Sequence, residues 1–273
     1  MSLVQQHAHA GAGAHGAASM WPVLMVAAVV VLALVYVGTA TRRRREPRGW
    51  SNWRTASFLT GLVFLAVALV PQLSPYPPGD FRGHMHQHLL IAMYAPLGLV
   101  LGAPVTLVLR SVPRRVGRMI GRVMRSRPVH LVANPVTALV LNLGGLAVLY
   151  FTPLYAATTV HPVLHHLVHV HFLAAGYLFA WVVAGPDPAP RRPSVLARLV
   201  VLGVAITGHA VLAQLLYAGV FVQVPKPVAQ VRAGADLMYY AGDIAELLLA
   251  LALVSTWRPR RKPARSRLAA AAA

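Results

Sequence analysis

Long apolar runs, each of about 20 residues, recur along this chain and constrain what it can fold into. A helix rises about 1.5 Å per residue, so such a run crosses a hydrocarbon core of roughly 30 Å. Backbone polar groups in that core must be paired within the segment, as they are in an α-helix. The sequence therefore predicts an all-α fold, a polytopic membrane helical bundle of about seven transmembrane helices. The expected spans are residues 20–40, 55–74, 84–109, 133–153, 162–184, 195–221 and 237–257.

Composition agrees with a membrane protein. Of the 273 residues, 57% are hydrophobic and only 11% are charged, which is too apolar for a soluble protein. The chain has no cysteine, which excludes disulfides, thiolate metal sites, iron-sulfur clusters and covalently attached c-type haem. A bound metal must then be held by histidine, methionine or carboxylate.

Positive charge is divided unevenly between the two ends of the expected spans. Of the 25 Lys and Arg residues, all but Arg82, Lys226 and Arg232 fall at one end. By the positive-inside rule that end is cytoplasmic, so the N-terminus is expected outside and the C-terminus in the cytoplasm. The formal charge of +19 is therefore explained by basic residues at the cytoplasmic face of a lipid bilayer. We expect no nucleic-acid partner. The arginine-rich residues 110–127 are compatible with a basic helix on the inner leaflet and equally with a solvated loop.

The chain is expected to have three regions. Residues 1–19, rich in His, Ala and Gly, predict a flexible tail. Residues 20–257 form the seven-helix transmembrane domain, and residues 258–273 are expected to be a basic, disordered cytoplasmic tail. Within the domain, Pro96 and Pro104 predict a kink near the middle of the third span.

Histidines cluster at the start of two expected helices. His161, His165 and His169 are four residues apart and fall on one helical face, and His84 and His88 are one turn apart. With the orientation above, both clusters lie at the outer end of the bundle. Imidazoles at this spacing are typical of metal or haem ligands. The sequence predicts a metal site built from these five histidines, whose side chains are expected to contribute little to packing.

Polar groups inside later spans lie at a similar depth. His209 belongs to the sixth span, and Asp243 and Glu246 are three residues apart on one face of the seventh. An ionised carboxylate facing lipid costs about 2.5 kcal/mol or more, so both are expected to face the bundle. His209 alone is equally compatible with an interhelical hydrogen bond. These three residues and Met85 are possible further contributors to the metal site.

Copper is the metal that this set of side chains favours. Imidazole suits copper, and Met85 and Met93 of the third span and Met238 of the seventh offer thioethers to the cuprous ion. Methionine is also an ordinary filler of apolar cores. We find no nucleophile triad, phosphate-binding loop or zinc-protease motif, so the sequence predicts that the chain is not an enzyme.

Two segments carry a family resemblance. They are HMHQHLLIAMYAPLGLVLGAPV, from His84, and HPVLHHLVHVHFLAAGYLFAWVVAGPDPAPRR, from His161. Both resemble the CtaG-type cytochrome c oxidase assembly factors of bacterial plasma membranes. The resemblance implies a multi-pass protein that helps to build haem-copper oxidase, at the stage of copper insertion into the catalytic subunit. The family's histidine motifs fall here on His84, His88, His161, His165 and His169.

Two other classes of protein remain open from the residues. Histidines of the third and fifth helices could clamp a b-type haem, which would make the chain an electron carrier. His209, Asp243 and Glu246 are also compatible with a proton-coupled membrane transporter.

Overall fold

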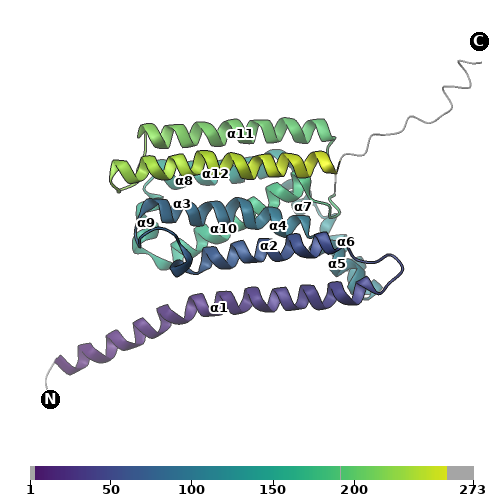
Figure 1. Ribbon diagram of the computed structural model, residues 1–273, viewed down its shortest axis with the longest axis horizontal. Helices are drawn as coiled ribbons and strands as arrows, with labels where there is room; N and C mark the ends of the chain where they lie inside the picture. Colours follow the sequence, from purple (N-terminus) through teal and green to yellow (C-terminus); the bar gives the residue numbers. More distant parts are fainter. Residues whose placement is uncertain (1–3, 191, 257–273) are drawn as a thin grey trace, which may run out of the picture.

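The computed structural model describes residues 4–190 and 192–256, with side chains from residue 23 onward, and in this part of the chain it contains helices and no strand. The long helices lie side by side in one bundle (Figure 1), and α10 contacts α4, α8, α11 and α12. The elements are α1 (Val4–Arg44), α2 (Asn52–Leu69), η1 (Pro71–Leu73), α3 (Phe81–Leu89), η2 (Leu90–Tyr94), α4 (Ala95–Leu101), α5 (Pro104–Ser111), α6 (Arg114–Met124), α7 (Arg127–Val132), α8 (Pro135–Phe151), α9 (Leu154–Val160), α10 (Pro162–Ala184), α11 (Val195–Ala218) and α12 (Val228–Ser255).

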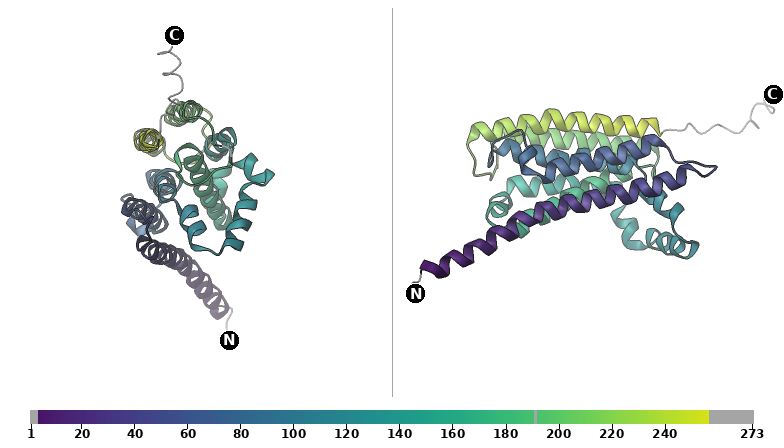
Figure 2. Two further views of the ribbon diagram at one scale, coloured as in Figure 1. Left: turned by 90° about the vertical axis from the view of Figure 1, so that its right-hand side faces the viewer. Right: turned by 60° about the horizontal axis from the view of Figure 1, so that its bottom comes forward.

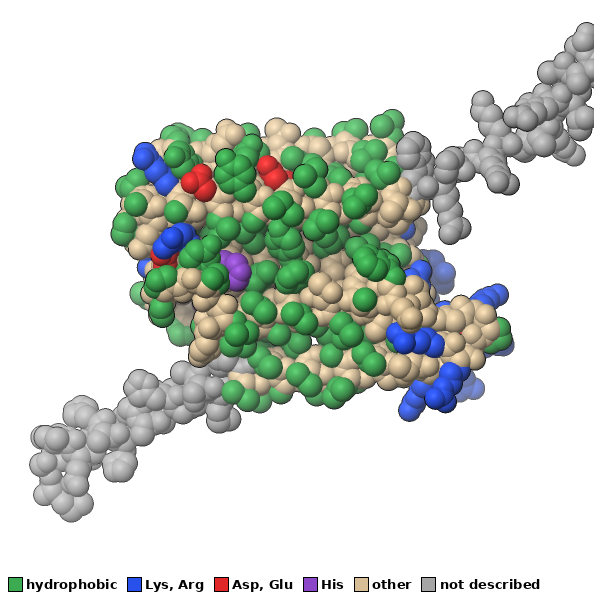
Figure 3. All heavy atoms as spheres, in the orientation of Figure 1, with side chains coloured by type: hydrophobic (Ala, Val, Ile, Leu, Met, Phe, Trp, Pro, Cys, Tyr) green, Lys and Arg blue, Asp and Glu red, His purple; other side chains and the backbone are tan. Residues whose placement is uncertain are grey.

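Five of these helices are long and apolar enough to cross a membrane, namely α1 from Val23 onward, α2, α10, α11 and α12. Two bent pairs raise the number to seven if each counts as one span: α3 to α4 with α5, and α8 with α9. Apolar side chains cover the flank of the bundle in Figure 3, as expected for a surface that faces lipid. The polytopic helical class is therefore confirmed, whereas the orientation of the termini stays a prediction.

The two ends of the bundle carry different side chains. α3, α10 and α12 begin at one end, which we call the histidine end because it carries His84 and His165. The opposite end carries α5, α6 and α7, and basic side chains gather there in Figure 3. We call it the arginine end. Both views in Figure 2 show the short helices of this end standing off from the long ones.

The third span is bent where proline requires it. A bend of 40° separates α4 from α5 immediately before Pro104, nearer the end of the predicted span than its middle. Pro96 is accommodated differently, because the turn before it is a π-helix in which Ala95 N–H bonds to the carbonyl of Leu90. Pro96 has no N–H to offer the carbonyl of Ala92 four residues earlier. Gly176 of α10 packs on that carbonyl so closely that a Cβ atom would lie 1.9 Å from it.

The GPDP turn after α10 closes the arginine end. Ala103, which precedes α5, has a left-handed φ of 52° and offers no side-chain cap. Asp187 of the turn supplies the cap instead, accepting hydrogen bonds from the N–H groups of Val105 at 3.0 Å and Thr106 at 2.7 Å. Its side chain is thereby buried and paired, as a carboxylate at a helix N-terminus should be.

Two boundaries differ from those predicted. α12 begins at Val228 rather than near residue 237, because Pro227 starts the helix and the intervening residues continue it. α1 takes in residues 4–19, where a flexible tail was expected; alanine, the strongest helix former, is frequent there. The expected tail at 258–273 lies outside the described residues.

The basic stretch 110–127 contains an amphipathic helix. In α6 the apolar side chains of Val116, Met119 and Val123 are exposed on one side, between arginines. This favours a helix lying at the membrane surface over a solvated loop.

Candidate functional site

An open cavity of about 810 Å³ lies at the histidine end, between the first turns of α3 and α10. We call it the end cavity. Its ionisable lining includes His84 and His86 from α3 and His165 from α10, and Tyr155 of α9 lies beside them. The cavity therefore brings together the two histidine clusters that the sequence places far apart.

Asp80 sets the start of α3 and with it the position of His84. Its carboxylate accepts from the backbone N–H of Arg82 at 2.8 Å and pairs with the Arg82 guanidinium at 2.7 Å. These bonds from Arg82 hold the pKa of Asp80 below its ordinary value. One turn further on, His84 Nε2 lies 3.2 Å from the hydroxyl of Tyr150, and its ring meets Tyr155 edge-on at 4.9 Å between centroids.

α10 presents a pair of histidines on the cavity side. The rings of His165 and His169 lie 4.2 Å apart between centroids, and both are half-buried. His165 lines the cavity and His169 does not. His161 is the N-cap of α10, is exposed, and is not part of the cavity lining. The structure thus brings His84 and His165 together at the cavity, with His169 beside His165, and leaves His161 outside.

His88 lies deeper than the other histidines of its cluster. It is only 4% exposed, and its ring meets Phe172 edge-on at 4.5 Å and Tyr150 at 6.2 Å between centroids. The expectation that these histidines contribute little to packing is therefore wrong for His88. The reason is that α3 starts three residues before His84, so that His88 already faces the interior.

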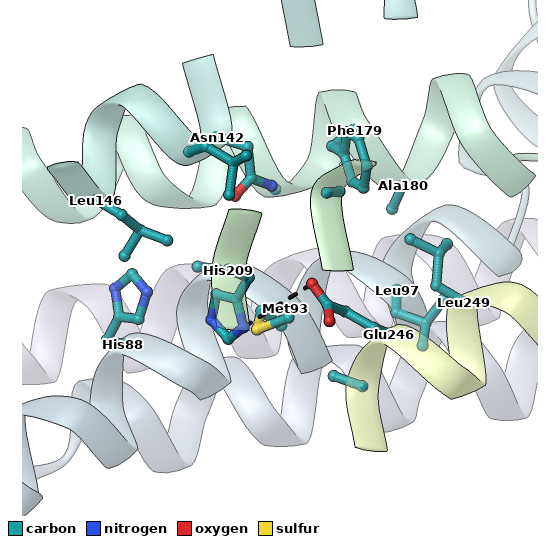
Figure 4. Close-up of a pocket in the computed structure, with 15 residues that line it drawn as sticks. His88, Met93, Leu97, Asn142, Leu146, Phe179, Ala180, His209, Glu246 and Leu249 are labelled. Atoms are coloured by element: carbon teal, nitrogen blue, oxygen red, sulfur yellow. Dashed lines mark ion pairs between the residues drawn. The ribbon is translucent and has the colours of Figure 1, made fainter. Parts of the chain in front are cut away.

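A second, much smaller space lies in the middle of the bundle. We call it the central chamber; its volume is about 40 Å³, and it is lined by residues of every long span from α3 to α12. Figure 4 shows its polar side chains facing one another across an apolar lining. The polar and sulfur-bearing residues that line it are His88, Met93, Asn142, His209 and Glu246.

A glycine socket on α12 positions His209. A Cβ atom at Gly242 would lie 2.2 Å from the His209 ring, so the ring lies against the α12 backbone. One turn further along α12, Glu246 Oε1 lies 3.9 Å from His209 Nδ1, too far for a hydrogen bond. Both ring nitrogens of His209 and Oε2 of Glu246 have no hydrogen-bond partner among the described residues.

The two carboxylates expected to face the bundle do not share one environment. Glu246 is buried, whereas Asp243 is half-exposed on the flank of α12, where acidic side chains are visible in Figure 3. Met85 is fully buried, and its sulfur lies 3.9 Å from the hydroxyl of Tyr150. It lines neither the end cavity nor the central chamber. Asp243 lines neither space, and its expected orientation toward the bundle stays a prediction.

The predicted five-histidine metal site stays a prediction. Among the described residues, no three His, Asp or Glu side chains gather closely enough to hold a metal ion together. What the structure offers is imidazole pairs and the His209–Glu246 pair. Sequence reasoning missed Tyr150, which orients His84, and Asn142, which faces the central chamber; a lone amide within an apolar span is the only signal that marks Asn142.

Fold and site together define a multi-pass helical membrane protein with a histidine-lined cavity at one end of its bundle. The profile of the cytochrome c oxidase caa3 assembly factor family matches residues 33–260, and the chain belongs to this family. The expected resemblance is thus confirmed.

Curated relatives are mycobacterial proteins. The chain is 34% identical over 197 residues to the uncharacterized protein ML1998 of Mycobacterium leprae, and 35% identical over 194 residues to the uncharacterized protein Mb0105 of Mycobacterium bovis. Each match covers 68% of this chain and 29% of the relative, so the chain spans less than a third of their length. No solved structure matches the chain.

Proposed function

We propose that the chain binds copper in the end cavity and passes it to a haem-copper oxidase subunit during assembly of that enzyme. The family is one of cytochrome c oxidase assembly factors, which supports an oxidase partner, a membrane setting and a role in assembly. The observation that carries the copper step is the convergence of His84 and His165 from two helices on an open cavity, with the His169 ring beside that of His165.

The donor set fits copper in transit. Imidazole suits copper, and a pair of imidazoles satisfies the low coordination number that the cuprous ion accepts. Tyr150 engages His84 Nε2, which fixes the ring and leaves Nδ1 as the nitrogen available to a metal, as outer hydrogen bonds do in metal sites. A cavity open at one side allows the ion to leave. Copper is cargo in this proposal rather than a resident group.

The proposed location is the bacterial plasma membrane, with the histidine end outside. The basic residues of the arginine end support this orientation, because such residues remain in the cytoplasm. The chain has no native cysteine, so any labelling by a thiol reagent comes from the single cysteine that is introduced. Pro78→Cys should react with an impermeant thiol reagent on spheroplasts, and Arg118→Cys should not. Equal labelling of the two would overturn the orientation.

Copper binding by the purified full-length protein tests the proposal. We expect the wild type to compete with a cuprous chelator, and His84→Ala with His165→Ala to lose that high-affinity binding. His171→Ala is the matched control, because His171 belongs to the same helix, is exposed and lies off the cavity. Unchanged affinity in the double variant would contradict the proposal. A Soret band with one haem per chain would replace it with the haem-carrier alternative.

A further inference from the structure

The central chamber contains the strongest unsatisfied polar groups of the bundle. His209 and Glu246 are only 3% and 5% exposed, and both project into the chamber (Figure 4). Three of their nitrogen and oxygen atoms have no hydrogen-bond partner within the described part of the chain. Groups buried in this way are normally paired, so a ligand in the chamber is the direct way to satisfy them.

We infer that the central chamber binds one cuprous ion between His209 and Glu246, with the thioether of Met93 beside them. The space of about 40 Å³ accepts an ion together with one or two water molecules. The separation of 3.9 Å between His209 Nδ1 and Glu246 Oε1 is close to the sum of two metal–ligand bonds of about 2.0 Å in line. The imidazole and the nearby thioether of Met93 are the donors that favour the cuprous ion, and the carboxylate supplies the opposite charge.

Charge selects a monovalent ion. Glu246 is the one carboxylate among the chamber's lining residues, and an ion of charge +1 makes the pair neutral in the apolar interior. A divalent ion would leave a net positive charge there, which the membrane interior disfavours. Sodium and potassium prefer oxygen donors, whereas nitrogen and sulfur donors favour copper.

The site is built into the helices rather than formed by loose side chains. Gly242 leaves room for the His209 ring against α12, and Glu246 follows one turn later on the same face. Met93 belongs to the π-helix, whose extra residue per turn changes the direction of its neighbours in the span. His209, Glu246 and Met93 are therefore held in place by the packing of the long helices that carry them.

His88 connects the chamber to the end cavity. It lines the chamber together with His209, and it lies one turn along α3 from His84, which lines the end cavity. This inference deepens the proposed function and rests on it for the choice of cargo: the end cavity admits the ion, and the chamber retains it at membrane depth.

Counting cuprous ions on the purified full-length protein tests the inference. Under anaerobic conditions, with silver(I) as a redox-inert probe of the same charge, we expect two ions per wild-type chain. Glu246→Gln, which preserves shape, should bind one. Asp243→Asn is the matched control, because it removes the same charge one turn away on the same helix, and it should bind two. Met93→Leu should remove a sulfur neighbour from the X-ray absorption spectrum of the loaded protein.

The variants separate the two sites. If the end cavity does not bind copper but the chamber does, the His84→Ala, His165→Ala variant will retain an ion that a further Glu246→Gln change removes. If Glu246→Gln binds as many ions as the wild type, the chamber site is wrong and water alone satisfies its polar groups. If the wild type binds zinc(II) and Glu246→Gln abolishes that binding, the assignment to a monovalent ion is wrong.

Discussion

The end cavity is about 20 times larger than the central chamber, about 810 Å³ against about 40 Å³, although both are lined by histidine. In the end cavity His84 is held by Tyr150, and His165 is half-buried beside His169. In the central chamber His209 and Glu246 are buried, and three of their polar atoms have no hydrogen-bond partner among the described residues. Exchange with a partner requires the first arrangement, whereas retention of an ion requires the second. Under the proposed function histidine would serve two tasks, and its depth in the bundle would decide which.

The largest expected effect concerns the helix contact that shapes the chamber. Gly176→Ala places a methyl group on the Ala92 carbonyl and should destabilise the bundle by roughly 3 kcal/mol. Gly144→Ala is the control, because nothing lies within 4 Å of the added atom and alanine favours a helix. Denaturant titrations in mixed micelles compare the two; equal stability would show that the close approach is not required.

Depth should also separate two histidines of the proposed copper route. His88→Ala removes a buried ring from between Phe172 and Tyr150 and should cost about 2 kcal/mol of unfolding free energy. His165→Ala, at a half-buried position, should cost less than about 1 kcal/mol. The same titrations measure both values. Equal losses of unfolding free energy in the two variants would mean that His88 and His165 contribute equally to packing.

The glycine socket offers a smaller and more local change. Gly242→Ala pushes the His209 ring from α12, so we expect a loss of about 1 to 2 kcal/mol and the loss of the chamber ion, with end-cavity binding unchanged. Gly203→Ala on α11 has open space and serves as control. If the Gly242→Ala variant retains both ions, Gly242 does not position His209 for ion binding.

The smallest effect is the pH dependence of the α3 cap. Because the Asp80 pKa is lowered in the folded state, its stabilisation is fully present above the unfolded pKa of about 4 and is lost as pH falls through the folded value. Asp80→Asn should lower the free energy of unfolding at pH 7 by less than about 1 kcal/mol, because the Arg82 partner is exposed, and the loss should be smaller at pH 3. A constant difference across this range would assign the effect to shape rather than charge.

Periodicity and length predict the spans well because each helix must satisfy its own backbone. They also predict the pairing of His165 with His169, which depends on one helix. The chamber depends on contacts between helices: Gly242 matters only because His209 of another helix faces it. The opposite environments of Asp243 and Glu246 likewise follow from how α12 is rotated against its neighbours, which spacing alone does not specify.

Copper in the host oxidase tests the central claim, delivery through the end cavity, most directly. Cells whose only copy of the protein carries His84→Ala and His165→Ala are grown at low external copper, and copper and haem are measured in the purified oxidase. The account predicts normal haem and less than half the normal copper, with His171→Ala cells unaffected. A fully metallated oxidase at normal expression of the double variant would contradict it.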